Sequence, residues 1–126
     1  MRRRIAALLL SLSLSVVVLG LHGRPTWAID YLASVSDLPL ADGLKEQTDK
    51  STVFDTPLGR IVTAYADGNL KPQAVLDFYD DTLPQLGWDK QKTGTYRRKR
   101  DVLKIDVWGP DEGPCKVSFT LSSQNQ

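Results

Sequence analysis

The segment PQAVLDFYDDTLPQLGW, residues 72–88, decides the fold because it carries the clearest helical pattern in the chain. Proline is tolerated in the first turn of a helix, so Pro72 marks the beginning. Apolar residues then recur at helical spacing along one face: Val75, Leu76, Tyr79, Leu83 and Leu86. Gly87 suits the left-handed conformation that ends a helix, Trp88 then packs back on Leu83, and Pro84 makes the last turn irregular.

Short strands are expected on both sides of this helix. Before it, residues 52–55 and 60–66 form a predicted hairpin, with Pro57 and Gly59 in the turn between them. After it, residues 88–92, 95–100, 103–108 and 115–121 predict four more strands. The order β-β-α-β-β-β-β and the tight connections predict an α+β fold of two layers, in which one helix packs on one face of an antiparallel sheet.

Four regions follow from this pattern. Residues 1–28 are a predicted signal peptide, residues 29–51 an extended N-terminal arm and loop, residues 52–122 the α+β domain, and residues 123–126 a polar tail. Within the second region we expect three leucines to pack on the domain: Leu38, Leu40 and Leu44. Residues 45–51 are polar and predict a mobile loop.

The first 28 residues have the three parts of a secretory signal. The basic residues at positions 2–4 precede an apolar stretch at residues 5–21, and the small residues Thr26 and Ala28 then form a cleavage site. Cleavage predicts a periplasmic or secreted protein that meets the membrane only during export. Residues 5–21 are also about as long as the shortest membrane-spanning helices, so an uncleaved inner-membrane anchor is the alternative.

Removing this segment changes the charge and the chemistry of the chain. Four of the 16 basic residues leave, so 12 face 15 acidic ones and the formal charge becomes −3, which does not favour nucleic-acid binding. The only histidine, His22, also leaves. Histidine-dependent nucleophilic and metal sites are thereby excluded, and we expect no enzyme, no cofactor and no metal.

The single cysteine, Cys115, has no partner for an internal disulfide. We interpret it as a small buried residue on a strand. An intermolecular bridge or a reactive thiol is the alternative.

The basic run Arg97, Arg98, Lys99 and Arg100 is the sharpest candidate for a binding site. Four charges along a strand would lie two on each face, which predicts an edge strand or a projecting strand end. The run could bind an anionic surface, such as phospholipid head groups, or an acidic partner in the envelope. The alternative is a solubilising edge whose charges pair with nearby aspartates: Asp77, Asp80, Asp81 and Asp101.

Trp108 is the second candidate. Strand alternation with Ile105 and Val107 places it on the outer face, where an exposed aromatic would be a contact site. The alternative is that the strand ends by Val107 and that Trp108 folds over the edge of the sheet.

These features favour a non-enzymatic binding or interaction module of the cell envelope, acting through the basic run and Trp108. A structural or accessory subunit of an envelope complex, docking through residues 29–44, is the alternative. An enzyme that uses carboxylates alone, such as Asp77 with Asp81, is the third possibility.

Three stretches carry a resemblance to a known group. VFDTPLGRI at residues 53–61, VLDFY at residues 75–79 and TLPQLGW at residues 82–88 resemble a group of small exported domains of alphaproteobacteria. The residues YRR at 96–98 and LKI at 103–105 also fit, so the resemblance covers about residues 37–122. It implies export and the fold described above. It implies no activity and no catalytic or binding residue.

Overall fold

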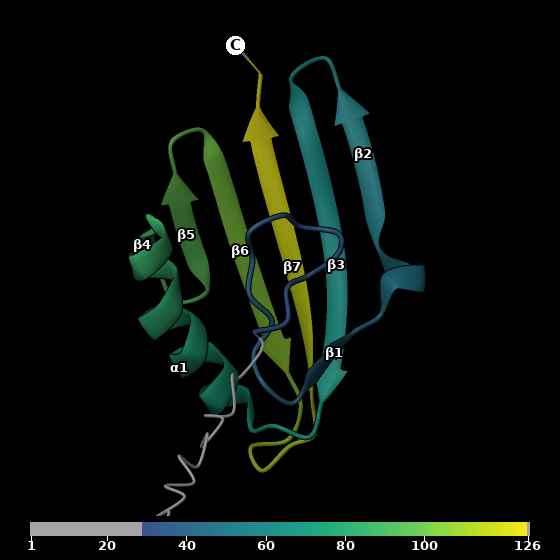
Figure 1. Cartoon of the computed structure of the whole chain (residues 1–126), viewed down its shortest axis with the longest axis vertical. Coiled ribbons are helices and arrows are strands. Elements are labelled where there is room, and N and C mark those ends of the chain that lie inside the picture. Colours follow the sequence, from purple (N-terminus) through teal and green to yellow (C-terminus); the bar gives the residue numbers. More distant parts are fainter. Residues whose placement is uncertain (1–28, 126) are drawn as a thin grey trace, which may run out of the picture.

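A seven-stranded antiparallel sheet organises the chain in the computed structural model, which describes residues 29–125 (Figure 1). The strands are β1 (Leu44–Glu46), β2 (Thr52–Thr56), β3 (Gly59–Gly68), β4 (Asp89–Lys92), β5 (Thr95–Arg98), β6 (Asp101–Trp108) and β7 (Cys115–Gln124). Their order is β1-β3-β7-β6-β5-β4, and β2 pairs with β3 beside β1. The predicted signal peptide and the alternative anchor lie outside the described residues.

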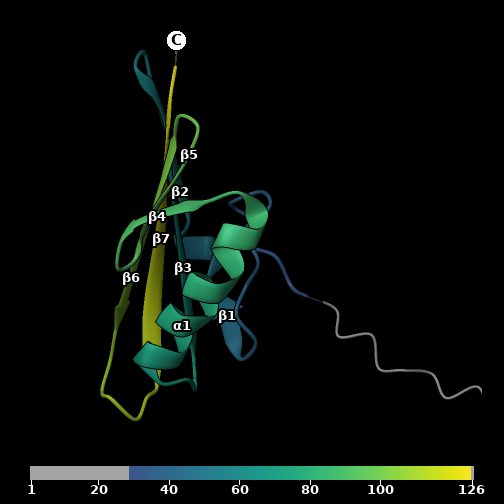
Figure 2. The ribbon, with the colours of Figure 1, turned by 90° about the vertical axis from the view of Figure 1, so that its left-hand side faces the viewer.

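One α-helix, α1 (Pro72–Thr82), lies on one face of the sheet, so the predicted α+β fold is confirmed (Figure 2). The 3-10 helix η2 (Leu83–Leu86) follows it and contains Pro84, as the sequence predicts. Gly87 has a φ of 84°, and the Trp88 amide donates to the Leu83 carbonyl at 3.1 Å, which ends the helix as expected. No helix among residues 29–125 has the length and apolar composition needed to cross a membrane.

The core lies between this helix and the central strands. Alternate residues of β3, β6 and β7 are buried on this face: Val62, Ala64, Ala66, Leu103, Ile105, Cys115, Val117 and Phe119. Val75 and Tyr79 of α1 and Leu83 of η2 are fully buried against them. Leu86, predicted on the same stripe, is 39% exposed. The tighter 3-10 turn at residues 83–86 rotates it off the core-facing side.

Cys115 is buried at the beginning of β7, as predicted. Burial raises the pKa of its thiol, which disfavours the reactive thiolate.

Residues 29–51 belong to the fold, so the prediction of an extended arm and a mobile loop is wrong. The Leu32 amide donates to the Leu38 carbonyl at 3.0 Å, which closes residues 32–38 into a compact loop over the sheet. Residues 45–51 contain part of β1 and the 3-10 helix η1 (Thr48–Lys50). This N-terminal segment lies on the same face of the sheet as α1 (Figure 2), and its apolar side chains join the core that the helix covers in part.

The contacts of this segment confirm that Leu38, Leu40 and Leu44 pack on the domain. All three are buried, together with Leu32 and Val35. The Tyr79 hydroxyl donates to the Pro39 carbonyl at 2.9 Å and accepts from the Ala41 amide at 3.4 Å. These bonds join the N-terminal segment to the middle of the helix.

The C-terminus also differs from its prediction. The predicted polar tail at residues 123–126 is wrong for its first two residues. Ser123 and Gln124 continue β7 and pair with Arg60 and Gly59. The strand β3 begins at Gly59, next to the hairpin turn. Because β7 extends to Gln124, it supplies hydrogen-bond partners for the backbone of β3 along its whole length.

Candidate functional site

The basic run occupies the tip of the β5–β6 hairpin. Arg97 and Arg98 are the last residues of β5, and Lys99 and Arg100 form the two-residue turn into β6. Because β5 lies between β4 and β6, it is not an edge strand. The predicted edge strand is therefore wrong, whereas the alternative of a projecting strand end is confirmed. The predicted two charges on each face are also wrong, because only Arg97 and Arg98 lie on a strand. We call these four residues the basic tip.

One of the four side chains is anchored. The Arg98 guanidinium lies 4.4 Å from the centre of the Trp88 ring, and its Nη1 donates to the Leu86 carbonyl at 3.3 Å. A guanidinium over an indole ring is attracted by the negative face of the ring. The side chains of Arg97, Lys99 and Arg100 are exposed. Three cations are thus free to contact a partner.

The predicted pairing of the basic tip with aspartates is not formed. Among residues 29–125, the ion pairs within 4 Å are those of Arg60, Lys71, Lys90 and Lys104. Asp89 and Asp101 lie opposite Arg97 and Arg98 in the strand register, yet neither forms an ion pair with them. The tip therefore holds four cations without a carboxylate partner, in a chain that carries excess negative charge after residue 28.

Lys99 adopts a backbone conformation that most residues avoid. Its φ is 54°, in the left-handed region that favours glycine. A side chain with a Cβ costs about 1–2 kcal/mol there. The hairpin turn thus keeps a lysine where glycine would be less strained.

Replacing Lys99 by glycine is expected to raise the free energy of unfolding by about 0.5–1 kcal/mol. The relief of strain exceeds the extra entropy that glycine loses on folding. Chemical denaturation of both proteins measures the difference. Arg100→Gly is the control, because Arg100 has no positive φ and its replacement by glycine should not stabilise. A destabilised Lys99→Gly variant would contradict the assignment of strain.

Trp108 lies at the other end of β6. It is 47% exposed and faces outward within the strand, so the predicted orientation is confirmed and the predicted fold over the edge is wrong. Its register partner is Lys116, and the two line a shallow hollow of about 270 Å³ with Tyr65 and Asp67. The seven residue steps from Asp101 to Trp108 span about 23 Å of strand. The structure therefore separates Trp108 from the basic tip.

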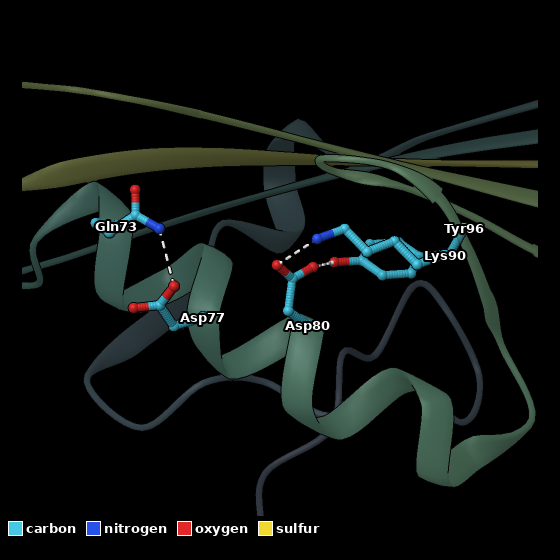
Figure 3. A network of polar contacts seen from close by, with 5 residues as sticks. All are labelled: Gln73, Asp77, Asp80, Lys90 and Tyr96. Atoms are coloured by element: carbon cyan, nitrogen blue, oxygen red, sulfur yellow. Dashed lines mark hydrogen bonds and ion pairs between the residues drawn. The ribbon is translucent and has the colours of Figure 1, made fainter.

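Two of the three helix carboxylates, Asp77 and Asp80, have structural partners (Figure 3). Asp80 accepts a hydrogen bond from the Tyr96 hydroxyl and pairs with Lys90 Nζ at 2.7 Å. Asp77 accepts from Gln73 Nε2 at 2.8 Å. Two hydrogen bonds lower the pKa of the Asp80 carboxyl. The bond from Lys90 has the larger effect, and the bond from Tyr96 has the smaller one. A carboxylate held ionised in this way is suited to join α1 to β4 and β5, and not to donate a proton near neutral pH.

Asp80→Asn is expected to lower the free energy of unfolding at neutral pH by about 1–2 kcal/mol, because a charged hydrogen bond becomes a neutral one. The folded pKa lies below the unfolded one, so this stabilisation is present above the unfolded pKa and is lost as the pH falls through the folded pKa. Denaturation at several pH values should show the two proteins converging below about pH 4. Asp81→Asn is the matched control, because the Asp81 side chain is exposed and forms no ion pair within 4 Å, and we expect a change within about 0.5 kcal/mol at neutral pH.

A second hollow, which the sequence does not predict, lies between the N-terminal segment and α1. It measures about 360 Å³ and is lined by apolar residues such as Leu40 and Phe78, with Asp30 and Asp42 among the polar ones. Its walls come from segments that are far apart in the chain, so no local pattern marks it. Within residues 29–125, no group of three histidine, cysteine, aspartate or glutamate side chains is placed to hold a metal ion.

No protein-family model, curated protein or solved structure matches this chain. The resemblance to small exported domains of alphaproteobacteria therefore stays a prediction from the residues that carry it.

Proposed function

We propose that the protein is an exported, non-enzymatic binding module that docks on an anionic partner through the basic tip. One observation carries the proposal: four consecutive cations, three of them exposed, lie at a hairpin turn without a carboxylate within 4 Å among the described residues. Export rests on the predicted signal peptide.

The backbone of the turn supports this proposal. Lys99 has a φ of 54°, where its side chain costs stability. Strained residues are common at ligand-binding sites, where selection for contact outweighs selection for stability. Contact between the Lys99 charge and an anionic partner would be a reason for a lysine, and not a glycine, to occupy this strained position.

The other two functions have less support. Docking in trans through residues 29–44 would require this segment to leave its own domain, yet Leu38 is 1% exposed and Tyr79 holds Pro39 by a hydrogen bond. A carboxylate enzyme would use Asp77 with Asp81, but both side chains are exposed on α1 and Asp77 accepts a hydrogen bond from Gln73. Asp80, on the same helix, is committed to Tyr96 and Lys90.

Titration of the chain from Ile29 onward with inorganic polyphosphate tests the proposal. This chain contains every described element, and the probe offers dense negative charge without apolar groups. We expect binding that weakens by roughly 10- to 100-fold between about 50 and 200 mM salt, because cations released from the polyanion drive the association. Absence of binding at low salt, or binding that does not respond to salt, would contradict the proposal.

A further inference from the structure

The β2–β3 hairpin exposes an unusual number of large apolar side chains. Four of the eight most exposed large apolar residues among residues 29–125 lie on it: Val53, Phe54, Leu58 and Ile61. Leu58, in the turn, is 83% exposed, and Phe54 is 65% exposed. We call these four residues the apolar tip. An exposed apolar edge strand promotes aggregation unless something covers it.

The apolar tip and the basic tip lie at the same end of the sheet (Figure 1). The strand register places Arg60 of β3 and Arg98 of β5 at the same level of the sheet. The pairs that connect them are Arg60 with Ser123, Ser123 with Asp101, and Asp101 with Arg98. Three strand spacings separate β3 from β5, which places the two hairpins about 14 Å apart. One flat surface can therefore touch both.

The charges at this end favour an anionic surface. The four cations of the basic tip have no ion-pair partner, and Asp55 on the apolar hairpin is paired with Arg60 at 3.7 Å. The pair reduces the repulsion that the Asp55 carboxylate would otherwise meet at a negative surface. The four cations of the basic tip outnumber Asp89 and Asp101, the two carboxylates in register with them, so the remaining charge at this end of the sheet is positive and lies beside exposed apolar side chains.

From this arrangement we infer that the partner of the basic tip is the surface of an anionic lipid bilayer. Leu58 and its apolar neighbours would enter the interfacial region, while Lys99 and the exposed arginines contact the phosphates of the head groups. A projecting apolar turn suits a deformable lipid interface, because it needs no preformed hollow in the partner. The inference rests on the proposed function and names its partner.

Binding of the chain from Ile29 onward to phosphatidylcholine vesicles, with and without phosphatidylglycerol, tests the inference. We expect binding only when phosphatidylglycerol is present. Leu58→Ser should weaken vesicle binding by tenfold or more, because burial of an exposed leucine contributes more than about 1.4 kcal/mol, the energy of a tenfold change. The same variant should leave polyphosphate binding unchanged, because polyphosphate offers no apolar environment.

Trp108→Ser is the matched control, because it removes an exposed apolar side chain at the opposite end of the sheet. It should change neither vesicle nor polyphosphate binding, and thermal unfolding should confirm that both variants fold. Vesicle binding that is absent, insensitive to Leu58→Ser or reduced by Trp108→Ser would overturn the inference. Polyphosphate binding through the basic tip would then still support an acidic partner of another kind. Loss of binding to both probes would overturn the proposed function as well.

Discussion

Leu38→Ala is expected to lower the free energy of unfolding by about 2–5 kcal/mol, the range for a leucine whose removal leaves a cavity in a packed core. Leu38 is 1% exposed and lies in the segment that covers the core face beside α1. If residues 29–51 were an arm attached to a complete domain, the substitution would have little effect on the unfolding of that domain. Denaturation with urea, followed by circular dichroism, measures the loss.

Leu58→Ala is the control for this prediction. It removes the same atoms from a side chain that is 83% exposed, so we expect a change within about 0.5 kcal/mol. A Leu38→Ala protein as stable as the unchanged chain, or one that loses no more than about 0.5 kcal/mol, would show that the N-terminal segment is not part of the core.

Replacing Arg97, Lys99 and Arg100 by glutamine is expected to weaken binding to an anionic surface by about 100-fold. Each basic residue near such a surface contributes about 1 kcal/mol, so three contribute about 3 kcal/mol. Arg98 is kept, because its guanidinium packs over Trp88 and its loss would also disturb the fold. Binding to polyphosphate and to anionic vesicles measures the effect.

The matched control replaces Lys45, Lys50 and Lys116 by glutamine. These lysines are exposed and form no ion pair within 4 Å, and their loss changes the net charge by the same amount. Lys45 and Lys116 lie in register with Asp67, at the end of the sheet opposite the basic tip. We expect a loss of less than about tenfold from this variant. Equal losses would mean that net charge, and not the basic tip, controls binding.

Local patterns predict the elements of this fold well. The helix follows from Pro72, the apolar stripe and Gly87, and the strand pattern of β7 places Cys115, Val117 and Phe119 in the core. In each case, the signal lies in the spacing of neighbouring residues. The order of elements and the two-layer arrangement follow from them.

Long-range features could not be predicted in the same way. Residues 29–43 contain Pro39 and Gly43 and show no period, because this segment is held by contacts with the core and not by a regular strand or helix. The separation of Trp108 from the basic tip depends on strand length and register, although their proximity in sequence suggested one surface. The β2–β3 and β5–β6 hairpins lie at the same end of the sheet because β3 pairs with β7 and β7 pairs with β6.

The most direct test of the basic tip is a residue-resolved map of where an anion binds. Amide chemical shifts of the ¹⁵N-labelled chain from Ile29 onward would be followed by NMR during a titration with inorganic polyphosphate. We predict that the largest changes occur at residues 97–101 and that amides near Lys45, Trp108 and Lys116 change little. Changes centred on those three residues, or spread evenly over the surface, would contradict the assignment of the basic tip as the binding site.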